Sequence, residues 1–135
     1  MEILVTGGAG FIGSHLAEHF LRHGHDVTTL GNFDPYYSTD LKQHNVEACR
    51  AAASATDGTF ELVEGSILDD QLVESTVADV DVIYHQAAQA GVRTSIDNPT
   101  KTNEVNVNGT LTVLNAARDA NVERVVFASS SSVYG

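Results

Sequence analysis

The sequence contains one cysteine, two prolines and no tryptophan among its 135 residues. A single cysteine, Cys49, excludes an internal disulfide framework and a zinc site built on cysteines. The apolar runs fall short of the roughly 20 residues that span a bilayer. The N-terminus also lacks the basic segment and long apolar stretch of a secretion signal. We therefore expect one soluble, cytoplasmic domain, since this length suits a single domain.

Positive charge is scarce as well. Seven Lys and Arg face 18 Asp and Glu, which gives a formal net charge of −11. A surface of this sign repels phosphate backbones, so we expect no partner among nucleic acids or anionic membranes. The acids are scattered along the chain, which favours a folded acidic surface over a disordered tail. Our hypothesis is a halophilic protein from a saline cytoplasm that screens this charge. The alternative is a generally acidic protein without that adaptation.

Short apolar runs alternate with helical patterns, which is typical of βαβ units around a parallel sheet. Strands are predicted at residues 3–6, 26–30, 60–63, 82–84 and 124–128, and helices at 11–22, 41–53, 69–77 and 100–120, with a turn-like stretch at 31–38. This order predicts an α/β fold: a three-layer, Rossmann-like, doubly wound parallel sheet with strand order 3-2-1-4-5. Because such sheets commonly continue beyond a fifth strand, we expect residues 1–135 to be a truncated, N-terminal cofactor-binding domain.

A glycine-rich turn, Gly7-Gly8-Ala9-Gly10-Phe11-Ile12-Gly13, lies between the first predicted strand and the first predicted helix. This context favours nucleotide binding. Gly7 permits the tight turn, Gly10 lets the backbone approach a pyrophosphate, and Gly13 allows close packing of helix on strand. Backbone N–H groups and the helix dipole then face the anion. The spacing differs from the strict G-x-G-x-x-G, so a plain tight turn is the alternative.

Four further motifs follow in order, and they resemble those of one family. Gly65-Ser66-Ile67-Leu68-Asp69 is similar to G-D-I-x-D, His85-Gln86-Ala87-Ala88 to H-x-A-A, Asn106-Val107-Asn108-Gly109-Thr110 to N-V-x-G-T, and the segment from Ser129 to Gly135 to S-S-S-x-x-V-Y-G. With the glycine turn, they resemble the extended short-chain dehydrogenase/reductases of the NAD-dependent epimerase/dehydratase group. Segments 32–37 and 87–93 are most similar to 4-epimerases of UDP-glucose or UDP-glucuronate.

This resemblance implies hydride transfer at the sugar C4 of a UDP-sugar substrate, through tightly held NAD and a 4-keto intermediate, in a homodimer. It implies cofactor contacts from Gly7, Gly10, Phe11, Ile12, Gly13, Gly31, Asn32, Ser66, Ile67, Gln86, Ala87, Ala88 and Gln89. Ser130, four residues before the tyrosine of V-Y-G, matches the hydroxyl that bonds the reacting sugar hydroxyl. Arg93 and Ser95, in an expected loop, are the other candidate substrate contacts.

Three positions depart from the family pattern. Gly31 stands where an Asp would hold the ribose hydroxyls, Ser66 where an Asp would contact the adenine, and Val105 where Asn or Thr is usual. Losing two carboxylates removes repulsion against a ribose 2′-phosphate. However, no Arg or Lys lies between Gly31 and Lys42, so we expect NAD rather than NADP.

The sequence holds no Tyr-x-x-x-Lys, the pair that supplies the general base in this family. We therefore expect the 135-residue chain to be inactive, with the substrate domain and the Tyr-x-x-x-Lys helix outside it. Without that helix, an apolar patch around the fourth and fifth strands should promote self-association. One alternative is a 4,6-dehydratase, although Ser131-Ser132 replaces the Asp-Glu of that group. The other is a dinucleotide-binding module without chemistry.

The remaining reactive side chains have structural explanations. His15, His19 and His23 recur every four residues, a spacing that can hold a metal, but no further ligand accompanies them. We expect a solvated helix face and no metal site. His85 ends a strand and is expected to be a packed, hydrogen-bonded histidine. Cys49 is expected to be inert.

Overall fold

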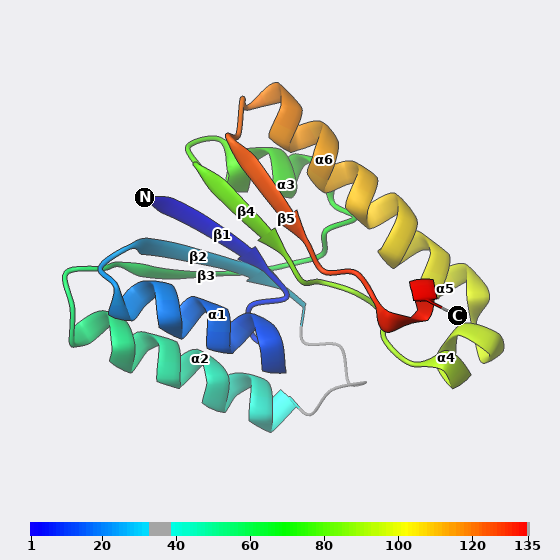
Figure 1. The fold of residues 1–135 in the computed structure, drawn as a ribbon, viewed down its shortest axis with the longest axis horizontal. Helices are drawn as coiled ribbons and strands as arrows, with labels where there is room; N and C mark the ends of the chain where they lie inside the picture. The colour runs from blue at the N-terminus through cyan, green and yellow to red at the C-terminus, as the bar shows by residue number, and fades with distance from the viewer. Residues whose placement is uncertain (33–38, 135) are drawn as a thin grey trace.

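The computed structural model describes residues 1–32 and 39–134. Within this part, five parallel strands form one sheet in the order β3-β2-β1-β4-β5 (Figure 1). The strands are β1 (Glu2–Thr6), β2 (Asp26–Gly31), β3 (Phe60–Glu64), β4 (Val82–His85) and β5 (Arg124–Phe127). The predicted fold class and strand order are confirmed.

Helices cover both faces of the sheet and make three layers. Helices α1 (Phe11–Arg22) and α2 (Thr39–Ser54) lie on one face, and α3 (Asp70–Val77) and α6 (Gly109–Asp119) lie on the other (Figure 1). The segment before α6 consists of α4 (Val92–Asp97), α5 (Pro99–Asn103) and a π-helical turn, η1 (Glu104–Asn108). A 3₁₀ turn, η2 (Ser131–Tyr134), follows β5.

The core has two halves because successive strand residues point to opposite faces. Leu4 packs with Ile83 and Val113 beneath α3 and α6. Its neighbours Ile3 and Val5 pack in a second cluster beneath α1 and α2. Since both faces are covered, the central strands read as continuous apolar runs, as expected for a parallel sheet.

Two predicted segments differ from the structure. The helix expected at 100–120 begins at Pro99 and is interrupted by the π turn η1. The loop expected to carry Arg93 and Ser95 is instead the short helix α4, which buries none of its residues. Such a six-residue helix leaves no apolar periodicity to read.

The turn expected at 31–38 falls mostly outside the described residues. Gly31 belongs to β2, where it pairs with Glu64, and residues 33–38, with the tyrosines at 36 and 37, lie beyond the described part.

Of the last two strands, β5 but not β4 exposes large apolar side chains. Val126 and Phe127 of β5 are exposed, whereas Val82 and Ile83 of β4 are buried. Leu111 is also exposed, on α6. Self-association through these residues stays a prediction.

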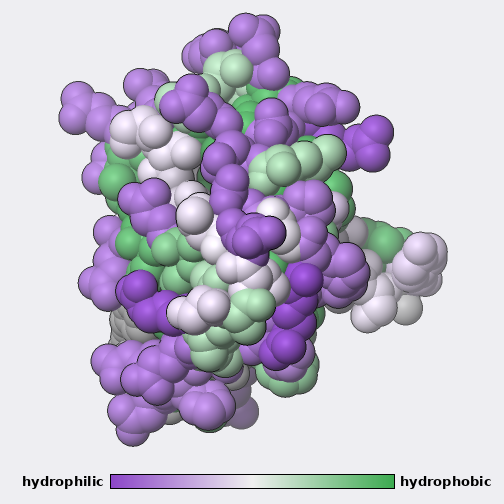
Figure 2. Space-filling model, turned by 90° about the vertical axis from the view of Figure 1, so that its left-hand side faces the viewer, coloured by the Kyte–Doolittle hydropathy of each residue, from purple (hydrophilic) through white to green (hydrophobic). Residues whose placement is uncertain are grey.

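The face from which the strands begin is largely hydrophilic (Figure 2). Purple side chains cover most of it, with smaller apolar areas near the middle, which suits a chain with a net charge of −11. In the described part, no helix is long and apolar enough to cross a membrane.

Candidate functional site

The glycine-rich turn closes tightly between β1 and α1. Gly7 adopts a positive φ of 68°, which L side chains rarely adopt. Its N–H donates to the carbonyl of Leu30 at 2.7 Å, and its own carbonyl accepts from the N–H of Gly10 at 3.0 Å. A Cβ on Gly7 would lie 2.9 Å from the backbone nitrogen of Ala87. Glycine is therefore required where β1 approaches the segment after β4.

The start of α1 is arranged to receive an anion. Gly10 is the N-cap, and no described side chain caps the helix, so the first N–H groups lack a side-chain acceptor. A Cβ on Gly13 would lie 2.2 Å from the Gly7 carbonyl oxygen. This contact brings the helix start directly over the turn, with its dipole pointing at the same place.

Gly8 is a further constraint that the motif did not reveal. A Cβ there would lie 2.3 Å from Cγ2 of Thr29. Because Thr29 lies on β2, the need for glycine at position 8 becomes visible only once β1 and β2 are paired in the fold.

An open cavity of about 240 Å³ lies over the glycine turn, at the carboxyl ends of the strands. Ligands bind at this position in open α/β sheets. The lining residues come from the turn, the ends of β2 and β3, α2, the segment after β4, α5 and η1: Gly7, Ala9, Gly10, Phe11, Gly31, Asn32, Lys42, Gly65, Ser66, Ile67, Gln86, Ala87, Ala88, Gln89, Ala90, Lys101 and Val105.

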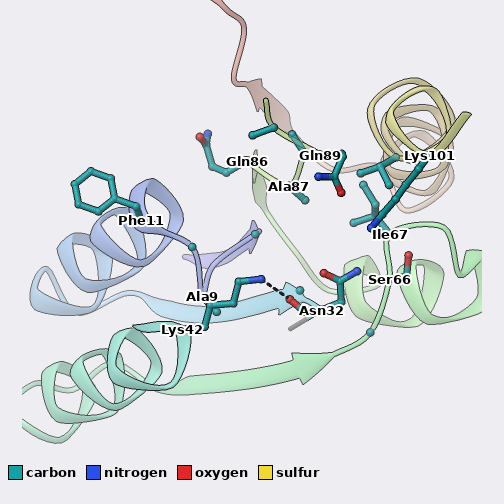
Figure 3. A pocket seen from close by; sticks show the side chains of 17 residues that line it. Ala9, Phe11, Asn32, Lys42, Ser66, Ile67, Gln86, Ala87, Gln89 and Lys101 are labelled. Carbon is teal, nitrogen blue, oxygen red and sulfur yellow. Dashed lines mark hydrogen bonds between the residues drawn. The ribbon is translucent and has the colours of Figure 1, made fainter. Parts of the chain in front are cut away.

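The cavity gathers every predicted cofactor residue except Ile12 and Gly13. Ile12 is 61% exposed on α1, and Gly13 packs against Gly7. Phe11 lines the cavity, but its ring points away from it (Figure 3). The sequence motifs did not reveal Ala9, Lys42, Gly65, Ala90 and Lys101 as lining residues, and Val105 was noted only as a departure from the pattern.

The segment after β4 is fixed from below by Thr6. The hydroxyl of Thr6 accepts the N–H groups of Gln86 and Ala87, each at 3.1 Å. It is also 2.7 Å from Nδ1 of His85, to which it donates its proton. Nε2 of His85 then donates to the hydroxyl of Thr110 at 2.9 Å. This pattern requires the neutral imidazole, and burial lowers the pKa of His85 accordingly.

Asn106 of η1 fixes the same segment from the other side. Its Oδ1 accepts the N–H of Gln89 at 2.8 Å, and its Nδ2 donates to the Gln89 carbonyl at 3.1 Å. Gly109 completes the approach, since a Cβ there would lie 2.4 Å from Cδ1 of Ile67. The π turn and the first residue of α6 thus hold two walls of the cavity, in keeping with the frequent occurrence of π turns at functional sites.

Among the described lining residues of the cavity, the charged side chains are positive, whereas the molecule as a whole is negative. Lys42 and Lys101 are the only lysines in the sequence, and both line the cavity. None of the described lining residues is Asp or Glu. Anionic ligands are therefore favoured at this place.

The predicted substrate contacts lie outside the cavity lining. Ser130 is exposed; its hydroxyl donates to that of Ser132 at 3.0 Å and accepts the Ser132 N–H at 3.1 Å. Arg93 is exposed on α4, and the hydroxyl of Ser95 donates to the carbonyl of Val92 at 2.5 Å.

The remaining His and Cys side chains that the structure describes have structural roles. No group of three or more potential metal ligands occurs among residues 1–32 and 39–134. In the α1 histidine row, His15 and His23 hydrogen-bond backbone carbonyls one turn earlier. Cys49 is fully buried, and burial raises the pKa of its thiol to about 11, so little reactive thiolate forms.

Known proteins are similar to this chain in sequence and in fold. The NAD dependent epimerase/dehydratase family matches residues 3–135. UDP-glucuronate 4-epimerase 2 of Arabidopsis thaliana is 40% identical over 138 residues, which cover 100% of this chain and 30% of that protein. A UDP-N-acetyl-alpha-D-glucosaminuronate decarboxylase of Bacillus cytotoxicus is 39% identical over 132 residues, which cover 98% of this chain and 37% of that protein.

A solved structure agrees with both matches. The UDP-glucose-4-epimerase of Stenotrophomonas maltophila, with bound NAD and formylated UDP-arabinopyranose, superposes with a TM-score of 0.84 at 31% identity. The match covers 100% of this chain and 38% of that one, so the chain spans less than half the length of each of these relatives. The chain belongs to the NAD dependent epimerase/dehydratase family.

Proposed function

We propose that this chain is the cofactor-binding part of an NAD-dependent nucleotide-sugar 4-epimerase. The observation that carries the proposal is the cavity over the glycine turn, where two lysines line the space above a helix start that has no side-chain cap. The pyrophosphate of a dinucleotide suits this place, because it carries negative charge and accepts hydrogen bonds from N–H groups. Bound NAD supplies a reversible hydride acceptor beside the sugar carbon.

The residues of the chain would bind and orient the cofactor. Gly7 and Gly10 let the backbone reach the pyrophosphate. Gln86, Ala87 and Gln89 form the wall that Thr6 and Asn106 hold in place. Small side chains on this wall leave room for a planar ring to approach.

Ser130 is our proposed contact to the reacting sugar hydroxyl. Its hydroxyl now pairs with that of Ser132, an exposed contact that a substrate can replace. The Ser131-Ser132 pair favours an epimerase over a dehydratase, since the latter group carries Asp-Glu there. Arg93 and Ser95 are proposed to contact the UDP-sugar only if α4 approaches it in a homodimeric, longer protein.

The test combines cofactor binding with product analysis. The 135-residue chain should bind NAD in isothermal titration calorimetry and convert no UDP-sugar, because it lacks Tyr-x-x-x-Lys. The product of the complete gene should interconvert the C4 epimers of UDP-glucose or UDP-glucuronate. Release of water or carbon dioxide from the sugar would instead indicate a dehydratase or a decarboxylase.

Substitution of Ser130 tests the catalytic contact in the active protein. Ser130→Ala should lower kcat by about 100-fold, the effect typical of a lost proton-transfer partner, while NAD affinity stays unchanged. Ser129→Ala, at the adjacent position, is the matched control. Equal effects of the two substitutions would contradict the role of Ser130.

A further inference from the structure

One chain of hydrogen bonds runs behind the cavity wall that follows β4. It begins at the N–H of Ala87, which donates to the hydroxyl of Thr6 at 3.1 Å. That hydroxyl lies 2.7 Å from Nδ1 of His85, and Nε2 of the same ring lies 2.9 Å from the hydroxyl of Thr110. Thr110 donates in turn to the carbonyl of Asn106 at 2.7 Å. The chain therefore passes from one end of the wall, through the sheet, to the turn η1.

The same chain reaches the other end of the wall. The side chain of Asn106 hydrogen-bonds both the N–H and the carbonyl of Gln89. Figure 3 shows Gln86, Ala87 and Gln89 along one side of the cavity. The ring of His85 lies between the two supports of this wall, so a change in the ring acts on both.

Each proton in the chain has one place. The Thr6 oxygen accepts the N–H groups of Gln86 and Ala87. Since these two bonds use both of its lone pairs, the hydroxyl donates its proton to Nδ1 of His85. The neutral ring then carries its own proton on Nε2 and donates it to Thr110. The arrangement accommodates one imidazole proton and has no acceptor for a second.

A second proton on His85 acts on Ala87. It makes Nδ1 a donor that faces the Thr6 oxygen, which must then release one of the two N–H groups that it accepts. Gln86 keeps an acceptor, because its N–H also reaches the Thr6 carbonyl at 3.2 Å. Within the described part of the chain, the N–H of Ala87 has the Thr6 hydroxyl alone. A Cβ on Gly7 would lie 2.9 Å from this same nitrogen, so a shift of residue 87 disturbs the wall where it meets the glycine turn.

The surroundings of the ring are neutral. His85 is only 2% exposed. The groups packed against it are the hydroxyl of Thr6 from β1, the ring of Phe127 from β5 and the hydroxyl of Thr110 from α6. Burial lowers the pKa of His85, and no charged side chain among residues 1–32 and 39–134 adds to this shift.

The titratable side chains of the elements around His85 lie away from its ring. They are Glu2 on β1, Tyr84 on β4, Glu104 on η1, Arg118 and Asp119 on α6, and Arg124 on β5. Glu2 and Arg124 begin their strands, whereas the ring lies where the strands end. Tyr84 points to the opposite face, where its ring centroid is 4.7 Å from that of Phe20. The remaining three are exposed to solvent.

We propose that His85 makes dinucleotide binding depend on pH: its neutral ring holds residues 86–89 in the binding position, and a second proton releases them and weakens binding. The inference rests on the proposed binding of a dinucleotide at the glycine turn. The ring is neutral at pH 7, and the effect develops as the pH falls below the ordinary value of 6.5 toward the lowered pKa. Because proton binding and dinucleotide binding oppose each other, NAD expels the proton from the protonated chain.

Calorimetric titration of the 135-residue chain with NAD measures the effect. The Kd should rise about two- to tenfold between pH 7.5 and pH 5.5, since a site closed by one proton loses at most tenfold in affinity per pH unit below the pKa. At pH 5.5, titrations in two buffers of different ionisation enthalpy should show that binding releases protons. NAD carries no group that titrates in this range, so the protons come from the chain or the buffer.

His85→Gln keeps one acceptor and one donor without titrating near neutrality. Its Kd should stay level between pH 7.5 and pH 5.5, and its binding should release no proton. His23→Gln is the matched control, because it removes an exposed imidazole just beyond the end of α1. This control should keep the pH dependence of the unsubstituted chain. Circular dichroism at each pH restricts the comparison to folded protein.

A second pair of variants alters the other partner of Nδ1 and does not depend on the folding of His85→Gln. Thr6→Val removes the hydroxyl and so frees the N–H of Ala87 at every pH. It should bind NAD about two- to tenfold more weakly at pH 7.5, the range for one lost hydrogen bond, with a level pH profile. Thr6→Ser retains the hydroxyl and should restore both the affinity and its pH dependence.

The outcomes separate this inference from the proposed function. A Kd of the unsubstituted chain that does not change with pH, or the same change in His85→Gln, would overturn the role of His85 while NAD binding itself upholds the proposed function. Failure of NAD to bind at any pH would contradict both.

Discussion

At the scale of the residue, His85 connects the sheet to the cavity wall. Its two ring nitrogens bond Thr6 and Thr110, and its ring stacks on Phe127 with centroids 6.0 Å apart. Both hydrogen bonds are satisfied by one neutral tautomer. A second proton would turn Nδ1 into a donor facing a hydroxyl that already accepts two N–H groups.

This arrangement predicts a pH dependence of stability. The unfolded chain protonates His85 near its ordinary pKa of 6.5, whereas burial lowers the pKa in the folded chain. Stability is therefore fully present above about pH 6.5 and falls as the pH drops toward the folded pKa, because the unfolded state then binds more protons. The loss amounts to about 1.4 kcal/mol per unit of pKa difference.

Urea unfolding between pH 5 and pH 8 measures this effect against a matched variant. His85→Gln offers one acceptor and one donor without titrating near neutrality. Its stability should fall less on acidification than that of the unsubstituted chain. Parallel curves for the two proteins would show that His85 contributes nothing to the dependence.

At the scale of the element, the π turn η1 places a side chain where a regular helix would not. The side chain of Asn106 hydrogen-bonds both the N–H and the carbonyl of Gln89, and Gln89 is only 8% exposed. Buried polar groups that lose their partners cost about 1–3 kcal/mol. The turn is therefore part of the cavity wall rather than a passive connection.

Asn106→Ala should lower the free energy of unfolding by about 1–3 kcal/mol and weaken NAD binding, because the wall at Gln89 loosens. Asn108→Ala is the matched control: the same substitution in the same turn, at an exposed side chain without a cap hydrogen bond. It should change stability by less than about 0.5 kcal/mol. Thermal melts and NAD titrations report both effects, and equal losses in the two variants would refute the explanation.

The sequence predicted elements whose pattern is local and missed those that depend on pairing. The apolar runs of β1 and β4 and the helical periodicity of α1 were sufficient to predict the type of these elements and their order along the chain. The helix predicted at 69–77 begins one residue later, at Asp70, because Asp69 is its N-cap and accepts the N–H of Leu72. The π turn left no such trace, because its i+5 bonds only slightly shift the helical period.

The candidate site could likewise be predicted only in part from the sequence. Motif residues that follow β1, β3 and β4 line the cavity as their order suggests. Lys42 and Lys101 could not be found this way, because they come from helices that enter the site through tertiary packing. Gly8 was missed for the same reason, since its constraint comes from Thr29 on another strand.

At the scale of the whole molecule, the net charge of −11 is the dominant property. Like charges on one small domain repel and destabilise the compact state, and salt screens that repulsion. We expect the melting temperature in molar KCl to exceed that in dilute buffer by roughly 4 °C for each kcal/mol of repulsion removed.

A variant with fewer surface acids separates this repulsion from general salt effects. Glu47, Glu74 and Glu123 are exposed, and replacing all three with Gln should reduce the gain in melting temperature on adding KCl. Equal melting temperatures of the original chain in both solutions would refute the saline hypothesis.

Because both lysines line the cavity, amine modification can be used to follow ligand binding there. Acylating reagents that attack primary amines can modify only Lys42, Lys101 and the terminal amine of Met1. The first two line the cavity, whereas the terminal amine lies by His25, at the end of the sheet where β1 begins. Because Lys42 is already buried, peptide mass spectrometry would read cavity occupancy as the protection of the Lys101 peptide, with the terminal peptide as an internal standard of reagent exposure.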